Sequence, residues 1–330
     1  MLDVRPTVVT GVAVPLYTMA THEFPALSAE KAGKRPRQTH AVATREAAAR
    51  IRDEVLKLDR LVDTYRAQNS SLGYFAAVYR EMTASVWRCL EPCSGQRQVV
   101  YPTLMADFIQ LFAKRYTDAL AAPDSATESW QLAFAAADSP LVVHLLSSMN
   151  AHIRLDLGLA LAAATRTETT CQLFRKDFDI INKLVSGYDP TNDLMGVSTP
   201  PGMVHNVAET LRRASPSTAL FDGVLGGWLR QALADRIVLE RVHVVDVAEA
   251  GIAALQSRRP GAWRELEQKR DAQVARAGRL LLARSRWSST LHKAVRWFER
   301  SPAEIIDALR PPSHSLVPLS TSASPSSLPR

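Results

Sequence analysis

The stretch MNAHIRLDLGL, residues 149–159, is the most informative part of this chain. It continues an apolar run and places His152 and Asp156 four residues apart, a spacing that stacks both side chains on one face of a helix. At 100° per residue the same face carries apolar side chains from Leu141 to Leu159. A histidine and an aspartate that point into a core cost free energy unless they pair with each other, with a third group or with a metal ion. The sequence therefore predicts chemistry on this face.

The composition is typical of a helical globular protein. The chain has 330 residues, enough to bury a large core, and 46% of them are hydrophobic and 22% charged. Glycine is scarce, whereas alanine, leucine and arginine are abundant, which favours helix over strand. The three cysteines form no disulfide framework or zinc-finger pattern, which predicts reduced thiols and a cytoplasmic location. No uncharged apolar window reaches 18 residues and no secretory pattern opens the chain, so we expect no transmembrane segment.

Apolar residues recur at helical spacing along most of the chain, and no sustained strand alternation occurs. We predict an all-α multi-helix bundle with a basic C-terminal helical extension. The predicted helices lie near residues 51–65, 75–86, 103–112, 140–164, 170–185, 202–213, 221–256, 262–283, 289–299 and 301–309.

Composition also divides the chain into parts. Residues 1–42 are Pro-rich and include a basic run, which predicts a mobile leader, and the Pro/Ser-rich residues 311–330 predict a disordered tail. Residues 43–310 are predicted to form a single all-α domain, in which residues 258–310 are the basic C-terminal helices. Residues 258–300 alone hold twelve Lys/Arg and four Asp/Glu, so the rest of the chain is close to neutral.

Several short motifs occur together in this chain. They are Asn150-Ala151-His152-Ile153, Asp156-Leu157, Asp177-Phe178 with Asn182, the aromatic run Tyr74 to Tyr79, and the block from Trp297 to Ile306. This set resembles the DUF5995 family of bacterial proteins over about residues 50–310, although Arg154 stands where a polar residue or histidine is expected. The function of that family is unknown. The resemblance therefore implies a compact helical domain and marks His152 and Asp156, but it supplies no reaction.

The pair His152 and Asp156 has three interpretations. An imidazole and a carboxylate at this spacing can ligate one divalent metal ion, with further ligands from facing helices. Asp156 can instead orient His152 for acid–base catalysis. The third interpretation is a buried hydrogen bond that fixes helix packing and has no chemical role.

Asp177 is a third candidate for catalysis or metal binding. On its predicted helix it shares a face with Leu173 and Ile181, so it points inward. Helices joined by a short loop are usually antiparallel neighbours, and we therefore expect Asp177 to approach His152 or Asp156. The alternative is a carboxylate in the first turn that interacts with the helix dipole.

The predicted long helix offers two more candidate catalytic residues, Arg236 and His243. They share a stripe with Glu240 and with apolar residues of that helix. The alternative is a ladder of surface salt bridges with a half-exposed histidine.

The function that we expect from these residues is that of a small-molecule enzyme. The chain has no Walker A, G-x-G-x-x-G or G-x-S-x-G motif. The sequence therefore does not indicate a P-loop NTPase, a Rossmann-type protein or a hydrolase with a nucleophile elbow. A hydrolase, lyase or cyclase with a His/Asp site remains, with a cofactor that is unknown or is a divalent metal ion. The alternative is a non-catalytic helical scaffold or interaction protein with a structural His–Asp pair.

The basic end of the chain carries three tryptophans among arginines, Trp263, Trp287 and Trp297. Such a mixture suits nucleic acid or an anionic membrane surface. We favour a solvated arginine-rich face with the tryptophans as core anchors, packed against the predicted helix at 221–256. Neither nucleic acid nor an anionic membrane is therefore an expected partner.

Overall fold

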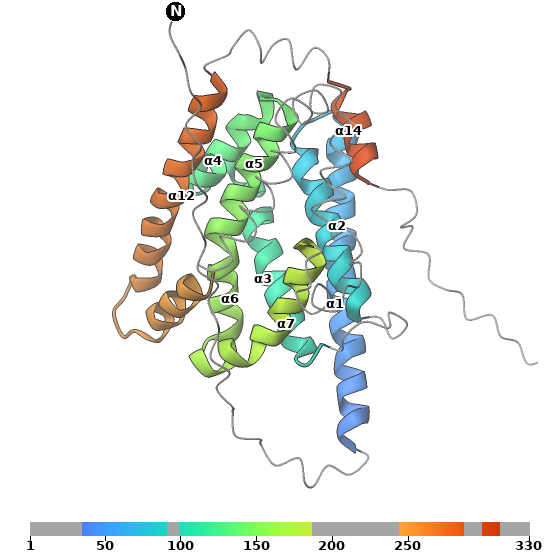
Figure 1. The fold of residues 1–330 in the computed structure, drawn as a ribbon, viewed down its shortest axis with the longest axis vertical. Coiled ribbons are helices and arrows are strands. Elements are labelled where there is room, and N and C mark those ends of the chain that lie inside the picture. The colour runs from blue at the N-terminus through green and yellow to red at the C-terminus, as the bar shows by residue number, and fades with distance from the viewer. Residues whose placement is uncertain (1–34, 91–98, 187–243, 287–298, 311–330) are drawn as a thin grey trace, which may run out of the picture. The chain divides into compact units, whose positions relative to one another are not determined.

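A computed structural model describes residues 35–90, 99–186, 244–286 and 299–310. All regular structure in these ranges is helical, which confirms the all-α prediction (Figure 1). The α-helices are α1 (Arg35–Ala67), α2 (Gly73–Leu90), α3 (Pro102–Ala121), α4 (Glu128–Ala135), α5 (Leu141–Ala151), α6 (Leu157–Thr165), α7 (Glu168–Ser186), α12 (Ala262–Arg286) and α14 (Pro302–Leu309), and residues 244–256 are helical too. Shorter turns are η1 (Pro123–Ser125), η2 (Ala136–Asp138) and the π-helical η3 (His152–Asp156).

The first helix begins earlier than the sequence pattern predicts. We expected a mobile leader to residue 42, but α1 starts at Arg35. Pro36 does not prevent this, because the first turn of a helix has no intrahelical partner for the missing N–H. The helix therefore begins within the segment predicted as a leader, whereas the larger compact unit begins at Ala41.

Helix α4 was not predicted at all. It has eight residues between Pro123 and Pro140, too few for a clear periodic pattern. Its N-terminus is held by Asp271 of α12, whose carboxylate accepts hydrogen bonds from the backbone N–H groups of Glu128 and Ser129 at 2.8 and 3.0 Å. A long-range carboxylate thus satisfies N–H groups that every helix start leaves without an intrahelical acceptor.

One hydrophobic core joins helices α1 to α7, the helix at 244–256 and α14. The chain divides into two units after His40, and this core lies in the second unit, from Ala41 on. A smaller cluster, formed by Leu155, Leu159 and Val274, joins the end of η3 and α6 to α12. No helix in the described ranges has both the length and the apolar character needed to cross a bilayer.

Helix α12 is a wall of the bundle, although we expected a basic extension. It packs against α4 and α5 (Figure 1) and against η3. Asn150 of α5 donates to the Val274 carbonyl of α12 at 3.0 Å. Trp263 packs against the helix at 244–256, where Gly251 leaves room for its ring. That contact was predicted for Trp263, whereas the other two tryptophans of the basic end lie outside the described residues.

Candidate functional site

The motif of residues 149–159 falls on a π-helical turn. Helix α5 leads directly into η3, and η3 leads directly into α6. In η3 the N–H of Leu157 donates to the carbonyl of His152, five residues back. The carbonyl of Arg154 inside this turn accepts a hydrogen bond from the Arg270 side chain of α12 at 2.9 Å. π-Helical turns are rare in proteins, and those that occur are often found at functional sites.

His152 and Asp156 contact each other in the core, as their spacing predicts. The His152 Nδ1 lies 3.1 Å from an Asp156 carboxylate oxygen, Oδ2. His152 is 2% exposed and Asp156 is 0% exposed. The predicted contact between the two buried side chains is therefore confirmed.

Asp156 has two further partners from other helices. Arg115 of α3 donates through Nε to Oδ1 at 2.7 Å, and Trp130 of α4 donates through Nε1 to Oδ2 at 2.9 Å. Arg115 also donates to Glu267 of α12 at 2.6 Å. Arginine and tryptophan side chains can only donate hydrogen bonds. Both oxygens of Asp156 therefore accept hydrogen bonds, and an ionised carboxylate accepts a further one from His152 when the imidazole proton is on Nδ1.

The imidazole of His152 is enclosed by aromatic rings. Phe112 stacks on it, with ring centroids 3.7 Å apart and an interplanar angle of 11°. Tyr79 meets it edge-on at 4.5 Å and 80°. The other rings around it, at 5.5–6.0 Å, are those of Phe75, Trp130 and Tyr116.

Burial decides the protonation of His152. Burial lowers the pKa of the imidazole, Asp156 raises it and Arg115 lowers it, and the net shift is downward. The ring is therefore neutral at neutral pH, with a proton on Nδ1 and a lone pair on Nε2. Nε2 is buried and has no hydrogen-bond partner among the residues that the structure describes. It is the basic nitrogen of an oriented His–Asp pair.

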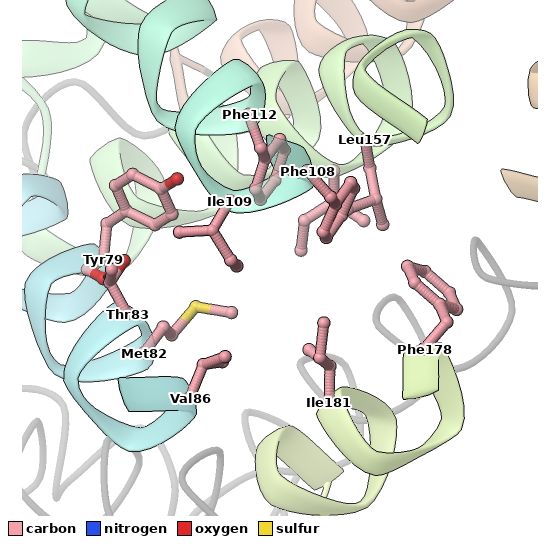
Figure 2. Close-up of a pocket in the computed structure, with 11 residues that line it drawn as sticks. Tyr79, Met82, Thr83, Val86, Phe108, Ile109, Phe112, Leu157, Phe178 and Ile181 are labelled. Atoms are coloured by element: carbon pink, nitrogen blue, oxygen red, sulfur yellow. The ribbon is translucent and has the colours of Figure 1, made fainter. Parts of the chain in front are cut away.

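A cavity of about 40 Å³ lies beside this pair, between α2, α3, α7 and the segment around η3 (Figure 2). Its walls are apolar except for two hydroxyl side chains, and no charged side chain lines it. The wall residues are Tyr79, Met82, Thr83, Val86, Phe108, Ile109, Phe112, Ile153, Leu157, Phe178 and Ile181. Tyr79 and Phe112 line the cavity and also touch the His152 ring, so two side chains separate the imidazole from this space.

The two hydroxyl groups of the cavity differ in their bonding. Thr83 donates to the backbone carbonyl of Tyr79 at 3.0 Å. The Tyr79 hydroxyl is buried and makes no hydrogen bond of normal geometry in the described part of the chain, although the Thr83 side chain lies close enough to lower its pKa. Burial raises the pKa of Tyr79 well above its ordinary value, and the carboxylate of Glu54 raises it further, so this hydroxyl keeps its proton.

Asp177 does not join the His–Asp pair, contrary to our prediction. It is fully buried, as expected, but its two oxygens accept the backbone N–H groups of Val100 and Tyr101, at 2.9 and 2.6 Å. These groups lie just before α3, where the helix start exposes donors and a positive dipole end. The carboxylate of α7 thus satisfies the start of α3.

The predicted metal site is not formed by these side chains. Among the described residues, no group of three or more His, Cys, Asp or Glu is arranged to hold a metal ion. The three-ligand set of His152, Asp156 and Asp177 was therefore wrong, because Asp177 binds elsewhere. The candidates Arg236 and His243 lie outside the described residues.

Most of the residues around His152 were not predicted from the sequence. Phe75 and Tyr79 on α2, like Phe112 and Tyr116 on α3, repeat the four-residue spacing of His152 and Asp156. Aromatic pairs at this spacing mark a common helix face, and that signal was available. The roles of Arg115 and Trp130 had no local signal, since they depend on how the helices pack.

The fold and the site define an all-α protein with a buried His–Asp pair in a π-helical turn. The sequence matches the family of unknown function DUF5995 over residues 51–284, and the chain belongs to that family. The match ends before residues 297–306, where the sequence alone also suggested a resemblance. No curated protein and no solved structure matches the chain.

Proposed function

We propose that this protein is an enzyme that acts on a small, uncharged molecule, with His152 as its general base. One observation carries the proposal: Nε2 of His152 is buried without a partner in the described residues, while Nδ1 is held by Asp156. A buried polar atom without a hydrogen bond costs about 1–3 kcal/mol. A catalytic role accounts for this cost, because a general base needs a nitrogen that is free to accept a proton from the substrate.

The chemistry of the pair suits proton abstraction. A neutral imidazole accepts a proton through Nε2, and the carboxylate of Asp156 stabilises the imidazolium that results. The lowered pKa of His152 keeps the ring in its basic form at neutral pH. A hydrolase, a lyase and a cyclase can each use this step, through a water molecule or through the substrate itself.

The cavity beside His152 is the proposed substrate site. Its apolar walls favour an uncharged molecule, because a charge there has no opposite charge among the lining residues. Its 40 Å³ is well below the roughly 150 Å³ of an engineered cavity that binds benzene, so it holds only one end of a substrate. Two of the lining residues, Met82 and Ile153, are partly exposed. Rotation of Phe112, which lies between the cavity and His152, would join the two.

The substitution His152→Asn tests this function. The asparagine amide nitrogen takes the place of Nδ1 and can still donate to Asp156, but nothing replaces Nε2. A metabolite extract is incubated with the wild type or with the variant and compared by untargeted mass spectrometry. We expect signals that the wild type consumes to persist with His152→Asn. Signals consumed equally by both proteins would contradict the role of His152.

A structural role is the second candidate, and one observation favours it. Asp156 accepts hydrogen bonds from three segments, through Arg115, Trp130 and His152, and so ties α3, α4 and η3 together. On this reading the protein is a helical scaffold. It predicts that His152→Asn lowers stability and changes no small molecule. An intact fold with lost turnover would exclude it.

A further inference from the structure

Arg115 links the buried His152–Asp156 pair to α12. Its Nε donates to Asp156 at 2.7 Å, and one of its terminal nitrogens donates to Glu267 at 2.6 Å. The side chains of Glu267 and Arg115 are 25% and 21% exposed, whereas that of Asp156 is 1% exposed. A chain of three charged groups therefore leads from near the surface to the imidazole.

The charge of Asp156 decides which nitrogen of His152 carries the proton. An ionised carboxylate only accepts hydrogen bonds, so the proton sits on Nδ1 and Nε2 keeps its lone pair. A protonated carboxyl can donate to Nδ1 instead, and the ring proton then sits on Nε2. In that second state the pair has no free base.

Arg115 places a positive charge 2.7 Å from the buried carboxylate of Asp156. Burial of an isolated carboxyl group favours its neutral form, and an opposite charge within hydrogen-bond distance favours the ion. Burial also lowers the pKa of Arg115, but the charges and hydrogen bonds of Asp156 and Glu267 outweigh this effect and leave its pKa raised. The guanidinium therefore stays charged beside the carboxylate.

Glu267 fixes the orientation of that guanidinium. The planar group presents its N–H donors in a fixed fork, so a partner on the outer side determines which donor faces inward. With a terminal nitrogen held by Glu267, Nε faces Asp156. Glu267 lies 152 residues after Arg115 in the chain, so α12 contributes to the surroundings of the site.

We propose that Arg115 is a positioning residue for His152: through the ionised Asp156 it holds the imidazole in the tautomer that leaves Nε2 free. Glu267 supports this role by holding the guanidinium. The use of the free Nε2 rests on the proposed function, but the tautomer itself is a property that can be measured without a substrate.

The test is the tautomer of His152 in protein labelled with ¹⁵N-histidine. Two-bond ¹H–¹⁵N correlation spectra near neutral pH distinguish a protonated Nδ1 from a protonated Nε2, and the His152 signal is assigned by its loss in His152→Asn. We expect the Nδ1–H tautomer in the wild type and a change of the major tautomer to Nε2–H in Arg115→Met. Arg115→Lys restores a positive charge and is expected to keep the wild-type tautomer. A folded Arg115→Met protein that keeps the Nδ1–H tautomer would overturn the proposal.

A second pair of variants separates positioning from general loosening. Glu267→Gln removes the negative charge of the outer partner of Arg115, and Asp271→Asn removes the charge of another α12 carboxylate, which accepts hydrogen bonds at the start of α4. We expect the Nε2–H population to grow in Glu267→Gln and not in Asp271→Asn, a comparison that also decides the matter if Arg115→Met does not fold. An equal effect in both variants, or none in Glu267→Gln, counts against the proposal. A tautomer change in a protein without turnover would contradict the enzyme and leave this inference standing.

Discussion

Replacing Asp156 by asparagine tests whether its carboxylate holds the helices together. The change keeps the size of the side chain, removes its charge and replaces one acceptor oxygen by an NH₂ donor. In the native structure Oδ1 accepts from Arg115, and Oδ2 accepts from Trp130 and His152. His152 can reverse its tautomer to meet a donor, but Arg115 and Trp130 cannot. Whichever way the amide is turned, one of these two donors faces an NH₂ group.

The size of the loss follows from these contacts. A hydrogen bond to a charged group contributes about 1.5–3 kcal/mol, and a buried donor left without a partner costs about 1–3 kcal/mol. Breaking a buried ion pair from one side costs about 3–5 kcal/mol, in agreement with that sum. We therefore expect Asp156→Asn to lower the free energy of unfolding by about 3–5 kcal/mol, a large part of the roughly 5–15 kcal/mol that a typical domain has.

Urea unfolding, followed by circular dichroism and by tryptophan fluorescence, measures this loss. The matched control is Asp307→Asn, which removes a carboxylate that binds Arg66 on the surface, where both side chains are about half exposed. Exposed ion pairs contribute little, so the control is expected to leave the urea midpoint nearly unchanged. A loss below about 1 kcal/mol for Asp156→Asn, or a loss no larger than that of the control, would refute this role of the carboxylate.

Three other outcomes follow from the same structure. Asp177→Asn keeps only one of two acceptors for backbone N–H groups, so we expect a loss of about 1–2 kcal/mol in urea unfolding, and an unchanged midpoint would contradict the capping role. Burial lowers the pKa of His144 from 6.5 to about 4, so the unfolded state takes up a proton at a higher pH than the folded state. The free energy of unfolding is therefore at its full value above pH 6.5 and falls by about 3 kcal/mol as the pH drops to about 4. His144→Phe is expected to flatten that part of the curve of stability against pH. Gly158→Ala would place a Cβ 2.6 Å from Val247 and is expected to lower the free energy of unfolding by about 1–3 kcal/mol. In Gly278→Ala the nearest atom to the new Cβ is 3.4 Å away, so this change is expected to stabilise α12 by about 0.5–1 kcal/mol. Thermal melts of the two variants should therefore shift in opposite directions.

Local signals predicted most of the described helices. The pattern near 170–185 corresponds to α7, and the start at Ser301 with Pro302 and Glu304 forms a capping box at α14. These features depend on residues three or four positions apart, which a helix brings together whatever surrounds it. Helix α4 has too few residues for such a pattern and relies on a carboxylate 142 residues away to hold the N–H of Ser129, so the sequence pattern gave no sign of it.

The sequence predicted contacts within one helix and the inward direction of a side chain, but not the contacts between helices. The pairing of His152 with Asp156 follows from spacing, and so does the inward direction of Asp177. Which groups an inward carboxylate meets depends on the rotation and offset of neighbouring helices, which the pattern does not specify. Asp177 meets the start of α3, and Asp156 meets Arg115 and Trp130.

The contacts of α12 explain why the motif of residues 149–159 needs this helix. Asn150 donates to a carbonyl of α12, the Arg154 carbonyl accepts from Arg270, and Asp156 reaches Glu267 through Arg115. The match to the DUF5995 family extends to residue 284 and so includes nearly all of α12, which ends at residue 286. A helix that supplied only positive charge would need none of these contacts. The α12 residues that contact the π-helical turn therefore support the candidate site as well as the fold, and the effect of Glu267→Gln on the His152 tautomer measures that support.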